Sequence, residues 1–166
     1  SLACNDGSNI ELCNSVGTAV DVYPCDQTCT PGNTTCDNGG SCASAIPVLQ
    51  SGTIAGTWYP WQTNYTTDDY GTCTGYESIG PENVYAVSLT AGQTLTVALS
   101  ATQSAQDSSL YLITDCSAVE TSCLAGDDGY GTDETVTYTA TADITVYIVA
   151  DNYDDVIYDD PTYSLT

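Results

Sequence analysis

Alternation of apolar and polar residues dominates the second half of the chain. Residues 93–99 and 134–140 alternate with a period of two, and residues 143–150 form a β-branched run that is apolar on both faces near its end. This period is typical of a β-strand with one buried face. No stretch has a convincing helical period. Shorter strands are predicted at 52–58, 83–89, 109–114 and 162–166.

The spacing of these strands predicts an all-β protein. Clusters of Gly, Asp and Asn separate the strands, as expected for the turns of an antiparallel β-sandwich. Alternate positions on a strand share one face of the sheet. The residues predicted to face inward are Tyr85, Val87, Leu89, Leu95, Val97, Leu99, Val136, Tyr138, Ile144, Val146 and Ile148.

The charge of the chain excludes several functions. Its 166 residues include 22 Asp and Glu but no Lys, Arg or His, which gives a net charge of −22. Such a chain repels nucleic acids and anionic membranes, and no apolar run is long enough for membrane insertion. Catalysis that needs a His base or a Schiff-base Lys is also excluded. Because some pair of 22 acids will have a glycosidase-like separation by accident, we do not predict an enzyme.

Cysteine content indicates an oxidising compartment. The chain has nine cysteines and no C-x2-C knuckle, so a disulfide framework is favoured over structural zinc. This predicts an extracellular or cell-surface protein. The odd number predicts either a free thiol or a bridge to another chain. The absence of an initiator Met suggests a mature or trimmed product. The cysteines are Cys4, Cys13, Cys25, Cys29, Cys36, Cys42, Cys73, Cys116 and Cys123.

Composition changes near residue 45. Residues 1–45 hold six of the nine cysteines between short polar connections, and a segment this short depends on disulfides for its stability. We therefore predict two parts, a small disulfide-rich N-terminal segment at 1–45 and the sandwich at 46–166.

The second part resembles a known family. The segments that carry the resemblance are Ile46-Pro47-Val48-Leu49, the turn and strand Ala91-Gly92-Gln93-Thr94-Leu95, and the late strand Tyr147-Ile148-Val149-Ala150-Asp151. Their order and spacing resemble the bacterial pre-peptidase C-terminal (PPC) domain. The resemblance implies a jelly-roll-like β-sandwich from a secreted bacterial protein, without catalysis of its own. Such domains commonly stand beside protease catalytic domains, and several bind calcium or polymeric substrates.

Two details follow from the same resemblance. A local disulfide between Cys116 and Cys123 would fit the related domains that carry such a pair. The Gly that usually precedes the final strand is replaced by Asp160-Pro161-Thr162, so a rebuilt last loop is expected.

Acidic residues concentrate in two loops, 126–134 and 151–160. If strands 134–140 and 143–150 pair in antiparallel fashion, both loops meet at one end of the sandwich. Clustered carboxylates with no cation repel one another, and calcium relieves that repulsion through oxygen ligands. The alternative is a solvated acidic rim. The predicted ligands are Asp127, Asp128, Asp133, Asp151, Asp154 and Asp155.

The main aromatic cluster contains Trp58, Tyr59 and Trp61. Exposed aromatic rings stack on sugars and anchor protein interfaces, so these residues are candidates for ligand binding. The alternative, which we favour, is that Trp58 and Trp61 close one end of the core.

Two functions remain open. The first is a self-associating filament or sheath subunit of the cell surface or matrix, stabilised by disulfides and calcium, whose partners are copies of itself. The second is an accessory module of a secreted bacterial hydrolase that binds a polysaccharide, glycan or protein polymer. The disulfides, the odd cysteine, the absence of tryptic sites and the lack of a catalytic constellation favour the first, which is the function we predict from the sequence. The family resemblance favours the second, which is the alternative.

Overall fold

The computed structural model describes residues 2–4, 9–13, 19–24, 39–59, 62–68, 70–102, 107–153 and 161–166, with side chains from residue 39 onward. Several residues singled out above lie outside this description. They are Trp61, Asp154, Asp155, Cys25, Cys29 and Cys36, together with the side chains of Cys4 and Cys13.

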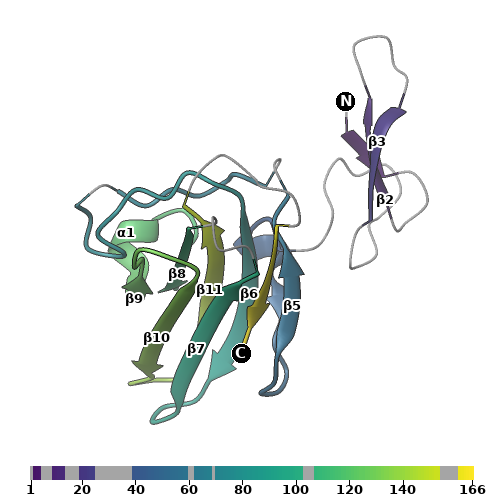
Figure 1. Cartoon of the computed structure of the whole chain (residues 1–166). Helices are drawn as coiled ribbons and strands as arrows, with labels where there is room; N and C mark the ends of the chain where they lie inside the picture. Colours follow the sequence, from purple (N-terminus) through teal and green to yellow (C-terminus); the bar gives the residue numbers. More distant parts are fainter. Residues whose placement is uncertain are drawn as a thin grey trace.

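Two β-sheets pack face to face, which confirms the predicted sandwich (Figure 1). One sheet has four strands in the order β10-β7-β12-β5, and the other has five in the order β4-β6-β11-β8-β9. The strands are β4 (Ile46–Pro47), β5 (Ile54–Thr57), β6 (Glu82–Leu89), β7 (Thr94–Ala101), β8 (Ser108–Ile113), β9 (Cys123–Asp127), β10 (Asp133–Thr139), β11 (Ile144–Asn152) and β12 (Thr162–Leu165).

Other elements are short. β1 (Leu2–Cys4), β2 (Asn9–Cys13) and β3 (Ala19–Pro24) form an antiparallel sheet in the N-terminal segment, which the sequence pattern did not predict. A 3-10 turn spans Cys42–Ser44, and α1 (Val119–Ser122) has four residues. No helix among the described residues is long and apolar enough to cross a membrane.

The core between the sheets matches the predicted pattern. Every residue predicted to face inward lies in this core or packs against it. The alternation is clear on β7 and β10, where Val97, Leu99 and Val136 are buried while Thr96 and Thr137 are exposed. Period-two patterning therefore determined which face of each strand packs inward.

One predicted pairing is wrong. Strands β10 and β11 do not pair, because β10 pairs with β7 in one sheet and β11 pairs with β6 and β8 in the other. Their connection crosses between the sheets, as is common in Greek-key sandwiches. The short connection predicted a hairpin, but β10 takes its partner from the four-stranded sheet and β11 takes its partners from the five-stranded sheet.

A second apolar cluster covers the outer face of the five-stranded sheet. Val84, Tyr111, Ile113 and Val149 project from this face, and Cys73 packs on them. Parts of the long β5–β6 connection and of α1 also pack there, through Tyr65 and Val119 respectively. The outer face of the five-stranded sheet is therefore covered. We call the parts of the β5–β6 connection and of α1 that pack on it the cover.

Two disulfides hold this cover in place, and they correct the pairing implied by the family resemblance. Cys42 bonds to Cys116 and Cys73 bonds to Cys123, so Cys116 and Cys123 do not bridge each other. The bridges span 74 and 50 residues of sequence. Each cysteine of the predicted local pair instead ties a distant segment to the outer face of the five-stranded sheet.

Candidate functional site

A row of acidic side chains crosses the covered face of the five-stranded sheet. Asp151 on β11 is opposite Glu82 on β6 and, on its other side, opposite Ser109 on β8. Asp128 follows β9, whose pairing with β8 ends at Leu110 and Asp127, so Asp128 comes next to Ser109. Cross-strand partners point to the same face of a sheet. We call Glu82, Asp151 and Asp128 the carboxyl row; the first two are fully buried, and Asp128 is 8% exposed.

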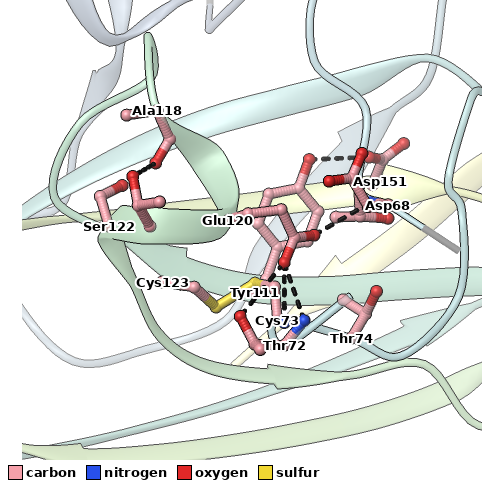
Figure 2. The surroundings of a disulfide bond; sticks show 12 residues. Asp68, Thr72, Cys73, Thr74, Tyr111, Ala118, Glu120, Ser122, Cys123 and Asp151 are labelled. Carbon is pink, nitrogen blue, oxygen red and sulfur yellow. Dashed lines mark hydrogen bonds between the residues drawn. A yellow bond between two sulfur atoms is a disulfide. The ribbon is translucent and has the colours of Figure 1, made fainter. Parts of the chain in front are cut away.

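Asp151 lies at the centre of the row. The Tyr111 hydroxyl donates a hydrogen bond of 2.9 Å to its Oδ2 atom, whereas Oδ1 is buried without a hydrogen-bond partner (Figure 2). Burial, and then the negative charge of Glu82, raise the pKa of Asp151 well above its ordinary range. The proton is therefore held much more tightly here than in water.

Glu82 accepts more hydrogen bonds than Asp151 does. The Asn64 backbone N–H lies 2.9 Å from Oε1 and 3.2 Å from Oε2, and the Asn64 side-chain amide donates to Oε1 at 3.2 Å. Burial nevertheless raises the pKa of Glu82 to about 7, with the Asn64 donors opposing part of that rise. Near neutral pH the Glu82 carboxyl group therefore populates both its protonated and its charged form.

Asp128 completes the row. Ser78 donates its hydroxyl proton to Oδ2 over 3.3 Å. Burial, followed by the charge of Asp107, raises the pKa of Asp128 to about 6. The charge of Asp128 also contributes to the raised pKa of Asp151, so these two acids lie near each other.

A further buried acid, Glu134, points inward from β10. Gly129 donates its backbone N–H to Oε2 at 3.0 Å, and Oε1 is buried without a hydrogen-bond partner. Burial raises the pKa of Glu134 to about 7, and the charges of Asp127 and Asp128 add to the rise. Asp127 itself accepts the backbone N–H of Thr135 at 2.8 Å.

Glu120 on α1 holds the β5–β6 connection over the carboxyl row by hydrogen bonds. Its carboxylate accepts the backbone N–H groups of Asp68 and Thr72 at 2.9 Å each, and that of Cys73 at 3.2 Å (Figure 2). The neighbouring disulfide between Cys73 and Cys123 fixes the same segment. The segment that lies over Tyr111 is therefore held by both covalent and charge-assisted bonds.

The residues predicted to bind calcium are dispersed by the fold. Asp128 and Asp151 lie in the carboxyl row, and Asp127 lies beside it. Asp133 is on the exposed face of the other sheet, where it accepts a hydrogen bond from Ser100. In the part of the chain that the structure describes, no three acids, cysteines or histidines are grouped closely enough to hold a metal ion.

The donor chemistry nevertheless suits a hard cation. The row offers carboxylate and hydroxyl oxygens, which calcium prefers. Two of these oxygens, Asp151 Oδ1 and Ser109 Oγ, are buried without a hydrogen-bond partner. Since the whole chain lacks Lys, Arg and His, only protons or a bound cation can neutralise the buried acids.

Neither Glu82 nor Glu134 was among the predicted site residues, although the sequence contains a signal for Glu134. Glu134 lies at alternate positions on β10 with Val136 and Tyr138, both predicted to face inward, so it points to the same face of the sheet. Its burial therefore follows from the same pattern. Glu82 could not be found in this way, because its burial depends on the cover over the outer face of the five-stranded sheet.

Trp58 belongs to the core rather than to a ligand site. It is fully buried, its indole N–H donates to the Ala150 carbonyl at 2.9 Å, and its ring lies 4.5 Å from that of Tyr163. This agrees with the favoured alternative for Trp58. Tyr59 is half-buried.

One known protein family matches the central part of this sandwich. The family described as the Bacterial pre-peptidase C-terminal domain matches residues 81–153, from the start of β6 to the end of β11. This match confirms the predicted resemblance to the PPC domain over residues 81–153, and PPC domains are non-catalytic modules of secreted bacterial peptidases. Together with the two disulfides, this indicates a secreted or extracytoplasmic protein.

Solved structures with a similar fold include two bacterial proteins. The pre-peptidase C-terminal domain of collagenase from Bacillus anthracis is 14% identical, with a TM-score of 0.48, over 74% of this chain and 92% of that one. PliG from Aeromonas hydrophila, a periplasmic inhibitor of g-type lysozyme, is 13% identical, with a TM-score of 0.40, over 73% of this chain and 91% of that one. No curated protein sequence matches the chain.

Proposed function

We propose that this chain is a non-catalytic accessory module that attaches a secreted bacterial hydrolase to a polymeric substrate outside the cell. The observation that carries the proposal is the family match over residues 81–153. It favours the accessory module over the self-associating filament or sheath subunit, which has no support from the comparisons.

The geometry is compatible with a module that binds rather than reacts. The carboxyl row is closed over by the segment that Glu120 and the Cys73–Cys123 disulfide hold in place. Acids that are enclosed in this way cannot meet the chain of a polymer. Binding would instead use the exposed surface of the sandwich, whose rigid sheets present side chains at fixed spacing.

Co-sedimentation with insoluble polymers tests the proposal. The chain is mixed separately with collagen fibrils, chitin particles and microcrystalline cellulose, and both pellet and supernatant are analysed. The expected result is saturable binding to at least one polymer, with no soluble fragments released. Failure to bind any of them, or release of fragments by the chain alone, would overturn the proposal.

Calcium is proposed as the ion that stabilises this module. Asp151 and Asp128 would supply carboxylate oxygens, the buried Oδ1 atom of Asp151 among them, and Asp154 and Asp155 remain predicted ligands from the following loop. When bound, calcium would cancel part of the negative charge at this end of the sandwich. Tyr111 and Ser78 would keep their present roles, each orienting one carboxylate by a hydrogen bond.

A further inference from the structure

The exposed face of the four-stranded sheet has an unusual composition. Its outward positions hold seven threonines, two serines, two alanines and one acid, Asp133. No large apolar or aromatic side chain interrupts them. We call this surface the threonine face. Its strand residues are Ala55, Thr57, Thr94, Thr96, Ala98, Ser100, Asp133, Thr135, Thr137, Thr139, Thr162 and Ser164.

Strand register arranges these hydroxyls in rows. Thr94 is opposite Thr139 and Thr96 is opposite Thr137 on β7 and β10. Adjacent strands lie about 4.8 Å apart, and alternate residues of one strand lie about 6.6–6.8 Å apart. The threonine face is therefore a grid of hydroxyls whose repeat is comparable to the size of a sugar ring.

Hydrogen bonds between threonine hydroxyls on adjacent strands restrain these side chains. The Oγ1 atoms of Thr94 and Thr139 are 2.8 Å apart, and those of Thr96 and Thr137 are 3.2 Å apart. At the other end of the sheet, the Thr102 and Thr162 hydroxyls are 2.7 Å apart. Because β-branched side chains already have restricted χ1 angles, binding a ligand here costs little further conformational entropy.

The charge of the face selects the kind of partner. In a molecule of net charge −22, the outward positions of these strands carry a single carboxylate, that of Asp133, and it already accepts a hydrogen bond from Ser100. A cationic partner would therefore find little to bind here and would be drawn to other surfaces. A hydroxyl both donates and accepts, so it can pair with another hydroxyl in either sense. The partner that complements this face is neutral, flat and rich in hydroxyl groups.

Tyr130 adds a sugar-compatible feature near one end. It lies in the loop that leads into β10, three residues before Asp133, and its side chain is fully exposed at 107%. An exposed aromatic ring stacks readily on the apolar face of a sugar. The opposite side of the sandwich offers no comparable grid, because the outer face of the five-stranded sheet is covered by its own apolar cluster.

We propose that the threonine face is a docking surface for a neutral polysaccharide with an extended, flat chain. This inference rests on the proposed accessory function and names its substrate class. Binding would depend on many weak hydroxyl contacts along the polymer rather than on one deep pocket, and repeated contacts accumulate affinity.

Isosteric substitution tests the surface. The double variant Thr96→Val and Thr137→Val removes two hydroxyls at nearly constant shape, and valine favours strands as threonine does. The matched control, Thr145→Val with Thr66→Val, removes two exposed hydroxyls away from the face. Binding to microcrystalline cellulose and to chitin particles is measured at low and at high salt, with melting temperatures to verify folding.

The proposal predicts that the unaltered chain binds cellulose or chitin with little dependence on salt. The face variant should then lose about tenfold or more in affinity while the control keeps it. Unchanged binding by the face variant would overturn the threonine face as the site and leave the accessory function standing. Binding to collagen fibrils alone would overturn the polysaccharide. Sedimentation as a dimer that the face variant abolishes would show a second copy as the occupant and overturn the proposal.

Discussion

Glu82 and Asp151 face each other on adjacent strands, both fully buried, in a chain that contains no Lys, Arg or His. Like charges directly opposite one another in a sheet are destabilising. In most proteins a buried acid pair of this kind would be neutralised by a nearby base. Here only a proton or a bound cation can do so, and this dependence leads to the first three predictions.

Stability should fall as pH rises. The folded-state pKa values are about 7 for Glu82 and Glu134 and about 6 for Asp128, against 4.5 and 3.8 for free Glu and Asp. The folded state therefore binds more protons than the unfolded chain between about pH 4 and pH 7. This contribution to the free energy of unfolding is fully present below about pH 4 and is lost as pH rises through about 6–7. Thermal melts at constant ionic strength, with chelator present, should give a higher melting temperature at pH 5 than at pH 8. A higher melting temperature at pH 8 would contradict the raised pKa values.

Substitution of Glu82 by Gln should flatten this pH profile. The amide oxygen of Gln can still accept from Asn64, while the charge opposite Asp151 disappears. With chelator present at pH 8, we expect the melting temperature of Glu82→Gln to rise by about 3–6 °C, and at pH 5 to change little. Glu77→Gln, at an exposed position, is the control and should be neutral. Equal destabilisation of Glu82→Gln at both pH values would mean that Glu82 acts only as a hydrogen-bond acceptor.

Calcium should have its largest effect where protons have left the carboxyl row. Calcium that binds only the folded state raises stability by mass action. At pH 8 a chelator should lower the melting temperature and excess calcium should restore it, whereas at pH 5 both effects should be small. Asp151→Asn should weaken the response because a buried charged ligand is lost. Asp143→Asn, which lies just before β11 at the opposite end from Asp151, should retain the response. Melting that is indifferent to calcium at pH 8 would leave protons as the only neutralising species.

Reduction of the disulfides should open the cover before the sandwich unfolds. Bridges that close 74 and 50 residues each restrict the unfolded chain by about 4 kcal/mol. After reduction, chymotrypsin should cut at Tyr70 and Tyr76, which are already exposed, faster than at the buried Tyr85. Mass spectrometry of early fragments measures this order. Simultaneous cleavage at all three positions would show that cover and sandwich unfold together.

The sequence was sufficient for the strands and their inward faces but not for the partners of each strand. Period-two alternation predicted β7, β10 and most of β11, together with the residues that they bury. It could not show that β10 and β11 enter different sheets, because local patterning carries no information on which distant strand offers a matching register.

The carboxyl row was only partly predictable for a related reason. Clustering of acids in the sequence indicated Asp128 and Asp151, yet those residues lie buried rather than on an exposed rim. Their burial comes from the β5–β6 connection, which packs over the sheet through Cys73 and Tyr65. A segment without periodicity gives no sign of where it packs, and the disulfide that fixes it, Cys73–Cys123, joins cysteines 50 residues apart in sequence.

The proposed module binds a polymer and does not cleave it. The decisive measurement is an adsorption isotherm on insoluble cellulose, chitin and collagen, recorded in calcium at neutral pH with product release followed in the same tubes. We expect saturable adsorption to at least one polymer, a polysaccharide if the threonine face is the site, and no soluble product. Flat isotherms on all three polymers, or product that accumulates with time, would contradict it.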